Sequence, residues 1–282
     1  MQHVITIEHI GTKKSKAAEI ILLSTAIIFL IIFLILPLLT VFQQAFSNGF
    51  TVFTDAVTDP TALSAVKLSL IASVISLFLN TLFGLSSSWL ITKYEFIGKS
   101  FLITLLDLPF TISPVISGMM FVLLLGANSF LGGILKELGI DIIFAVPGII
   151  IATTFVTFPY VARELIPQMQ ASGNEEEEAA RLLGANGLKI FFKITLPKIK
   201  WSLFYGLILC NARAMGEFGA VSVVSGHIRG MTNTIPLHIE ILYNEYMFSS
   251  AFAVASLLTL LALLTLIVKN AIERITKRKY LT

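Results

Sequence analysis

The 282-residue sequence has few charged residues and one cysteine, and both shortages limit what the protein is. Charged side chains make up 13% of the chain, whereas soluble globular domains carry about 25%. The single cysteine, Cys210, has no partner for an internal disulfide and cannot build a cysteine metal cluster. We expect it to be a small packing residue within a helix. The composition is that of a membrane protein.

The sequence also lacks the motifs of an enzyme that acts alone. The nearest approach to a phosphate-binding loop, G-x-x-x-x-G-K-[ST], ends in Gly98-Lys99-Ser100, but Lys93 stands where its first glycine should be. The four histidines show no metal-ligand spacing. No nucleophile stands in an evident pattern with a base. We therefore expect this chain to have no catalytic residue, no cofactor or metal site, and no nucleic-acid partner.

What the sequence does contain is six long apolar windows. A helix that crosses a lipid bilayer needs roughly 20 mainly apolar residues. The first window is too long for the apolar part of a signal peptide, so we interpret it as a span. The expected fold class is an all-α, polytopic membrane protein with six transmembrane helices. The windows are residues 20–42, 66–92, 101–126, 143–163, 201–225 and 248–268.

Basic residues alternate between the connections. Sixteen of the twenty Lys and Arg lie in the two terminal tails and in the connections between spans two and three and between spans four and five. Cytoplasmic loops are enriched in Lys and Arg, so both termini are predicted to be cytoplasmic. We assign residues 1–19 and 269–282 to cytoplasmic tails and residues 20–268 to one membrane domain. The tail before residue 17 is either loose or a short helix on the membrane surface.

Turn and break signals mark three other places. The third window contains Pro109 and Pro114, each of which removes a backbone donor, so we expect its helix to be bent or locally opened. Asp107 is expected to cap the broken helix backbone. Residues 43–65 are rich in turn-forming residues, and residues 126–140 contain four glycines, which predicts a broken loop with a short helix.

The longest charged interruption, residues 172–197, ends in EEEEAARLLGANGLKIFFKITLP. Ser172 and Asn174 each stand three residues before a glutamate, which is the spacing of a capping box, and glutamates favour the first turn of a helix. Gly184 is suited to end that helix. A second short helix, about 188–194, is expected to end at Pro197. Physically, the segment is either an amphipathic loop helix on lipid headgroups or a docking element for a partner.

A resemblance favours docking. The pattern E-A-A, three residues, G, nine residues, I-x-L-P resembles the EAA signature of ABC-importer permeases. In that family this loop is the coupling helix, which sits in a groove of a separate ATPase subunit. The resemblance implies that ATP and Mg are bound by that partner and that ATPase coupling belongs to the motif residues here. These residues are Glu178, Ala179, Ala180, Gly184, Ile194, Leu196 and Pro197.

Further stretches narrow the resemblance to the W-type permease subunits of sulfate/thiosulfate importers. They are ITLLDLPFTISPVISG (103–118), TFPYVARELIPQMQ (157–170), NARAMGEFGAVSVVSG (211–226) and IRGMTNTIPLHIE (228–240). ARAMGEFGA is shared with molybdate and tungstate permeases, whereas its VSVVSG…IRG continuation favours sulfate. The resemblance implies a type I importer permease (MetI-like) fold in the bacterial inner membrane. It also implies two copies of an ABC ATPase, a second homologous permease and an extracytoplasmic sulfate-binding protein.

The fifth window contains Asn211, Arg213 and Glu217. A charge within the membrane costs at least about 2.5 kcal/mol, and Arg213 lies roughly 18 Å along the helix from Trp201, near the bilayer middle. Arg213 and Glu217 are four residues apart and can form an ion pair. This pair either lines an anion path or fixes helix packing. Outside the membrane, Arg229 belongs either to a gate or receptor contact that favours anions or to a solvated loop.

Three rival functions stay open at this point. The nearest is the same machine working on molybdate or tungstate. An ion-driven secondary anion carrier would need ion-binding groups near the midplane and usually shows inverted repeats, and the sequence shows no repeat. A membrane-embedded enzyme would need a catalytic cluster that the sequence lacks.

Overall fold

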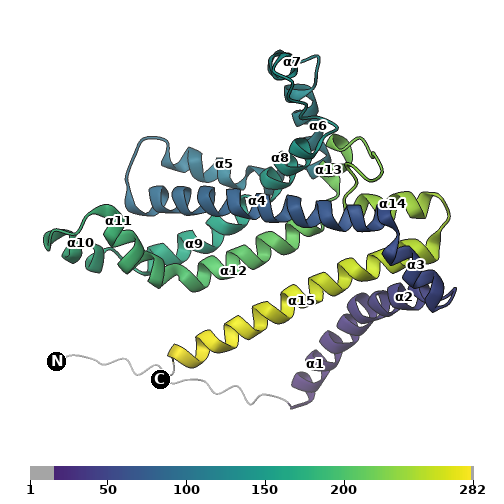
Figure 1. The fold of residues 1–282 in the computed structure, drawn as a ribbon. Helices are drawn as coiled ribbons and strands as arrows, with labels where there is room; N and C mark the ends of the chain where they lie inside the picture. Colours follow the sequence, from purple (N-terminus) through teal and green to yellow (C-terminus); the bar gives the residue numbers. More distant parts are fainter. Residues whose placement is uncertain (1–15, 281–282) are drawn as a thin grey trace.

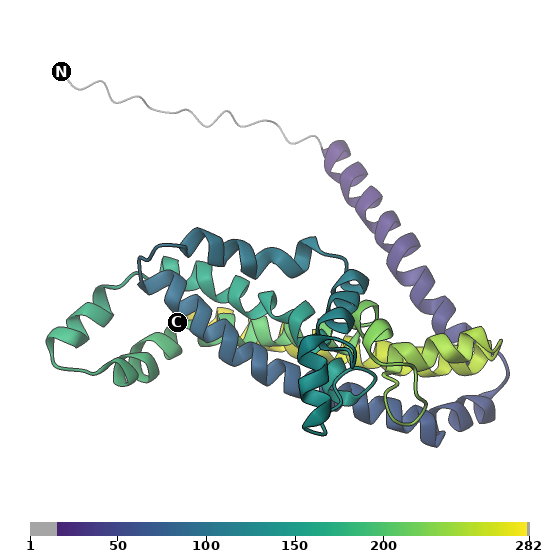
Figure 2. The ribbon, with the colours of Figure 1, turned by 90° about the horizontal axis from the view of Figure 1, so that it is seen from above.

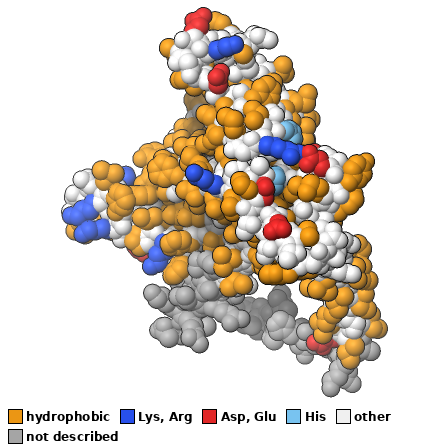
Figure 3. All heavy atoms as spheres, turned by 45° about the vertical axis from the view of Figure 1, so that its right-hand side comes forward, with side chains coloured by type: hydrophobic (Ala, Val, Ile, Leu, Met, Phe, Trp, Pro, Cys, Tyr) orange, Lys and Arg blue, Asp and Glu red, His pale blue; other side chains and the backbone are white. Residues whose placement is uncertain are grey.

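The computed structural model describes residues 16–280, so the expected tail before residue 16 lies outside the described residues. The described chain folds entirely into helices and turns, in agreement with the predicted fold class (Figure 1). Hydrophobic side chains cover most of the face seen in Figure 3, and charged side chains form small separate groups on it. Such a surface fits lipid or protein better than water.

The first expected span is one long, exposed helix that stands apart from the rest. It consists of α1 (Lys16–Leu30), a π-helical turn (Ile31–Ile35) and α2 (Leu36–Ala45). Figures 1 and 2 show α1 diverging from the bundle, while α2 approaches the start of α15 (Phe248–Tyr280). No side chain of its most apolar 18-residue stretch is buried within the described chain. This surface is free to face lipid or another subunit.

The prediction that a helix ends at Pro197 is wrong, because a second π-helical turn (Phe191–Thr195) precedes this proline. This turn joins α11 (Gly187–Ile190) to α12 (Leu196–Met215) without a break, so Pro197 lies in the first turn of α12 and ends no helix. A proline ring clashes with the carbonyl four residues earlier, and a wider π turn removes that clash. The first π turn likewise precedes a proline, Pro37.

The longest helix, α4 (Pro60–Lys93), begins at a strong cap. Asp59 Oδ2 accepts hydrogen bonds from the backbone N–H groups of Thr61 at 2.8 Å and Ala62 at 3.2 Å. The Thr61 hydroxyl also donates to it, and this hydrogen bond is the main cause that lowers the pKa of Asp59. The preceding connection has the expected turn at Gly49, but it also contains the helix α3 (Phe50–Thr58).

One side of α4 packs against other helices at the centre of the bundle. A Cβ at Gly84 would lie 2.6 Å from Val161 Cγ1, so only glycine allows α4 and α9 (Pro159–Ala171) to approach this closely. One helical turn earlier in α4, Asn80 Nδ2 donates to Thr157 Oγ1 of α8 (Val146–Thr157) at 2.7 Å. The buried serine, asparagine and glycine residues of α4 are Ser69, Ser73, Ser76, Asn80, Gly84, Ser87 and Ser88.

The third window is broken, as its prolines predicted. α5 (Lys99–Thr111) and α6 (Pro114–Leu125) meet at a bend of 109°. Pro109 is accommodated within α5, whereas Pro114 occupies the first position of α6, where its missing N–H costs nothing. The expected short helix after this window is α7 (Phe130–Glu137).

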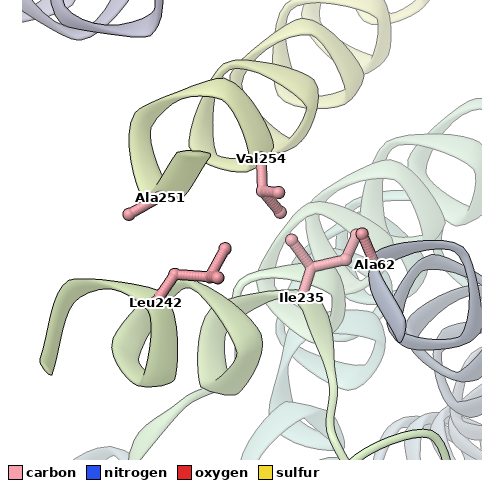
Figure 4. Packing of buried hydrophobic residues seen from close by; sticks show 5 residues of the cluster. All are labelled: Ala62, Ile235, Leu242, Ala251 and Val254. Carbon is pink, nitrogen blue, oxygen red and sulfur yellow. The ribbon is translucent and has the colours of Figure 1, made fainter. Parts of the chain in front are cut away.

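Two short helices complete the end of the molecule near α7. α13 (Gly219–Val224) packs against α6, and α14 (Ile235–Asn244) packs against α15 and the start of α4. Figure 4 shows the apolar cluster that joins α4, α14 and α15. Its buried members are Ala62, Ile235, Leu242, Ala251 and Val254.

The expected count of six spans is not reached by length and composition. Among the described residues, four helical segments qualify, and a fifth if the bent pair α5–α6 is one span. α12 was expected to cross as part of window 201–225. It carries Lys198, Lys200 and Arg213, and it ends at Met215, where Gly216 begins a turn before α13. Lys198 and Lys200 precede the fifth window, which therefore consists of a helix with Arg213 near its end, followed by a break.

Candidate functional site

The charged segment forms a short helix, α10 (Glu175–Leu182), at one end of the molecule (Figure 1). Gly184 ends it in the left-handed conformation with φ +80°, as predicted. The N–H groups of Ala185 and Gly184 donate to the carbonyls of Ala180 and Arg181, both at 3.0 Å. This pair of hydrogen bonds is the Schellman arrangement. The glycine fixes the direction in which the chain leaves the helix.

The two predicted capping boxes are wrong. Asn174 occupies the N-cap position of α10 but makes no side-chain cap; its Oδ1 accepts from Lys93 Nζ at 2.7 Å. The Ser172 hydroxyl donates to the carbonyl of Gln168 at 2.8 Å. Glu177, expected to complete one box, also pairs with Lys93, at 3.0 Å. A charge-assisted hydrogen bond is stronger than a neutral one, so the distant lysine takes the side chain of Asn174 from the local cap.

The outward face of α10 is apolar at its tip. Leu182 and Leu183 are 91% and 89% exposed, and no residue of α10 is buried within the described chain. Glu178 and Ala179 are also exposed. The sequence reasoning did not single out the leucines, although a Leu-Leu pair inside the most charged segment was a signal. Exposed leucines beside small alanines form a surface suited to protein contact.

The remaining residues of the predicted motif serve the connection to the bundle. Leu196 packs on a buried cluster that includes Leu165 and Met169 of α9. Ile194 is half-buried and Pro197 is exposed. The predicted coupling residues thus divide into an exposed group around α10 and an anchoring group at the start of α12.

The predicted ion pair in the fifth window is present. Arg213 Nη1 lies 2.5 Å from Glu217 Oε2, with side chains 31% and 1% exposed. The other oxygen of Glu217 accepts from the N–H of Ala220 at 2.9 Å, at the start of α13. Glu217 therefore links the end of α12 to α13, and Arg213 compensates a buried carboxylate while keeping part of its guanidinium side chain accessible.

The other two predicted path residues lie elsewhere. Asn211 lines a groove of about 350 Å³ with Leu77 of α4 and Leu261 of α15. Two helical positions correspond to a rotation of about 200°, so Asn211 and Arg213 face opposite ways. Arg229 pairs with Glu245 beyond α14. The structure therefore brings together only Arg213 and Glu217 of the four.

A second ion pair was missed by the sequence analysis. Arg163 Nε donates to Asp107 Oδ1 at 2.9 Å, and its guanidinium carbon lies 4.5 Å from the centre of the Phe110 ring. The prediction that Asp107 caps broken backbone is thus wrong, because an arginine from α9 takes its carboxylate. The partners are 56 residues apart in sequence, so no local pattern could reveal them.

A buried histidine lies near the amino-terminal end of α4. His238 of α14 is 3% exposed, and burial lowers the pKa of its imidazole, while the negative charges of Asp59 and Glu245 partly oppose this shift and Arg229 adds to it. In the same region, Ser69 Oγ accepts from the N–H of Ile235 at 2.8 Å. A neutral histidine is part of this packing.

Comparisons with known proteins place this arrangement in context. The family model described as "Binding-protein-dependent transport system inner membrane component" matches residues 80–278. The chain is 46% identical over 267 residues to the sulfate transport system permease protein CysW of Synechocystis sp., covering 95% of this chain and 97% of that protein. It is 34% identical over 251 residues to the sulfate transport system permease protein CysT of Salmonella typhimurium, covering 89% and 91%.

The fold also matches a solved structure. A chain of the bacterial alginate ABC transporter, crystallised in complex with an alginate-pentasaccharide-bound periplasmic protein, superposes with a TM-score of 0.76. The match covers 93% of this chain and 96% of that chain at 22% identity, so it is evidence for the fold alone. Together these similarities confirm the resemblance to permease subunits over nearly the whole chain.

Proposed function

Because the chain belongs to the family of binding-protein-dependent transport system inner membrane components, we propose that it is the W-type membrane subunit of an ATP-driven importer of sulfate and thiosulfate. The observation that carries this is the 46% identity to a sulfate permease of the W type across 95% of the chain. Identity to a T-type sulfate permease is lower, at 34%. This difference supports a heterodimer in which a T-type permease is the second membrane subunit.

The proposed role of α10 is to dock on a separate ATPase that holds ATP and Mg. Burying one leucine stabilises an interface by about 1.5–3 kcal/mol, and Leu182 and Leu183 are both available. The exposed Glu178 adds a carboxylate that suits arginine or lysine on the partner. Each of the two permeases offers one such loop, so two ATPase copies bind. The chain itself then performs no catalysis.

The end of the molecule that bears α10 is proposed to be cytoplasmic. The carboxy-terminal ends of α4 and α9, the start of α12 and the end of α15 all lie towards that end (Figure 1). This supports cytoplasmic termini in the inner membrane, and we propose that α14, near the other end of α4, lies on the side where an extracytoplasmic sulfate-binding protein docks.

Arg213 is proposed to contact the anion during passage. Cys210, one helical turn earlier, touches Thr157 and Asn80, so Arg213 lies about 4.5 Å further along, level with the middle of the 34-residue α4. A partly accessible guanidinium at this depth has to face water or protein, because lipid solvates it poorly. Glu217 keeps the local charge near zero, so a dianion is attracted weakly and released readily.

The test is uptake by a reconstituted complex. The chain is co-purified with the candidate ATPase, T-type permease and sulfate-binding protein and placed in liposomes, and uptake of radioactive sulfate is measured with and without ATP. We expect accumulation that requires ATP and is inhibited by thiosulfate more than by molybdate. Accumulation without ATP contradicts the importer. Stronger inhibition by molybdate would mean that the same machine transports molybdate. Molybdate permeases share the ARAMGEFGA stretch of this chain.

A further inference from the structure

α10 is joined to the membrane helices by polar contacts. No residue of α10 is buried within the described chain. The glycines on either side, Gly173 and Gly184, have φ values of +63° and +80°, and no atom lies within 4 Å of where their Cβ would be. The segment therefore contributes no buried side chain to the packing of the described chain. Besides the chain itself, which continues into α9 and α11, polar links join α10 to the bundle.

Most of these links converge on Lys93, the last residue of α4. Its Nζ donates to the carbonyl of Gly173 at 3.2 Å and to Asn174 Oδ1 at 2.7 Å, and it pairs with Glu177 Oε2 at 3.0 Å. The side chains of Lys93 and Glu177 are only 9% and 13% exposed. An ion pair shielded from water in this way is stronger than a surface pair.

Glu177 also reaches the next helix. Its Oε1 accepts a hydrogen bond from the hydroxyl of Thr195 at 2.6 Å, and Thr195 is buried in the π turn that leads into α12. One carboxylate of α10 thus joins the end of α4 to the start of α12. We call Lys93, Gly173, Asn174, Glu177 and Thr195 the Lys93 cluster.

The neighbouring ion pair has a different character. Glu176 pairs with Lys198 at 2.8 Å, but the Glu176 side chain is 65% exposed. Surface pairs of this kind contribute about 0–1 kcal/mol. Two adjacent glutamates of one helix therefore differ in their surroundings, which offers a matched control.

We propose that the Lys93 cluster is the positioning element that transmits movement of α10 to α4 and α12. This rests on the proposed function, in which an ATPase moves α10. α4 suits the task because it runs through the whole bundle and packs against α8, α9 and α12. A displacement of α10 that pulls on Lys93 shifts one rigid helix that contacts all three. Lys93 and Glu177 touch no substrate; they act through α4.

The experiment compares coupling ratios in the full reconstituted complex. K93M and E177Q are measured beside wild type and the control E176Q, with three readouts: co-purification of the ATPase, ATP hydrolysis, and sulfate taken up per ATP hydrolysed. We expect K93M and E177Q to retain the ATPase, because the exposed leucines are unchanged. Sulfate uptake per ATP should fall about tenfold, within the range of allosteric coupling, and E176Q should resemble wild type.

The double variant K93M/E177Q tests whether the two residues act together. We expect it to be no worse than either single variant, because each removes the same link. If K93M and E177Q keep the wild-type ratio, or if E176Q falls equally, the proposal is wrong. Should K93M fail to assemble, T195V decides: it removes only one hydroxyl, and an unchanged ratio in T195V then overturns the proposal.

The same data separate this inference from the proposed function. A wild-type complex that takes up no sulfate with ATP contradicts the proposed function. A wild-type complex that is active, with all variants equally active, contradicts the transmission role of the Lys93 cluster alone.

Discussion

The middle of the bundle and the end that bears α10 are built on different principles. In the middle, α4 and α9 approach so closely that Gly84 leaves no space for a methyl group, and Val161 and Leu165 are fully buried. At the end, α10 buries nothing within the described chain and exposes two leucines. The middle is packed within a single chain, whereas the end is the surface that the proposed ATPase would cover. Stability and coupling should therefore respond to different substitutions.

The largest effect is expected from G84A. The new Cβ would lie 2.6 Å from Val161 Cγ1 and 3.3 Å from the backbone nitrogen of Ala162, so the two helices must separate. Overpacking of this kind costs typically about 1–3 kcal/mol. We expect a lower melting temperature and less assembled complex, measured by thermal unfolding in detergent. The control is G187A, where no atom lies within 4 Å, and it should not lower stability. Equal melting temperatures contradict the close approach.

The next largest effect is expected on binding of the ATPase, with no change in the stability of the chain. L183D places a charge on a fully accessible position, so the melting temperature of the isolated chain should not change. Loss of one buried leucine weakens an interface by about 1.5–3 kcal/mol, so retention of the ATPase in pull-down should fall at least about tenfold. L138D, at an exposed leucine after α7, is the matched control on the opposite side and should retain the ATPase. If L183D and L138D both lose the ATPase, or both retain it, α10 is not the docking element.

The sequence predicted the features that depend on neighbouring residues. The bend at Pro114 and the glycine end of α10 follow from local backbone chemistry, and both are present. The Arg213–Glu217 pair was predictable because four residues place two side chains on one helix face. The α-helical class followed from the long apolar windows.

Predictions failed where a distant residue competes with a local one. Asn174 has the right identity and position for a cap, but Lys93, 81 residues earlier, takes its side chain. Asp107 is taken by Arg163 in the same way. Pro197 was expected to end a helix, and a π turn accommodates it instead. Each outcome depends on tertiary packing that a single sequence does not display.

A smaller effect separates Arg213 from Arg229. R213Q removes the cation at mid-depth, and we expect sulfate uptake to fall by about tenfold while assembly and binding of the sulfate-binding protein persist. R229Q breaks an exposed pair with Glu245, which is worth about 0–1 kcal/mol, so uptake should change less than threefold. Uptake assays in liposomes measure both. If uptake is unchanged in R213Q, the Arg213–Glu217 pair does not line the anion path and only fixes helix packing.

The smallest effect is a dependence of stability on pH that arises at His238, near the amino-terminal end of α4. Burial lowers the pKa of His238 below its ordinary value of 6.5, so the unfolded chain binds a proton more readily than the folded chain. Stability from this residue is complete above 6.5 and decreases as pH falls below it. We expect the melting temperature to drop between pH 7.5 and 5.5, and to drop less in H238Q. An equal drop in both excludes His238 as the cause.

The contact between α10 and the ATPase can be observed directly. A photocrosslinker placed at Leu183 in membranes that actively import sulfate should capture the ATPase, and the yield should change when ATP is bound, while the same group at Leu138 should capture none. If the Leu183 probe captures no ATPase while uptake continues, the exposed tip of α10 is not the coupling surface.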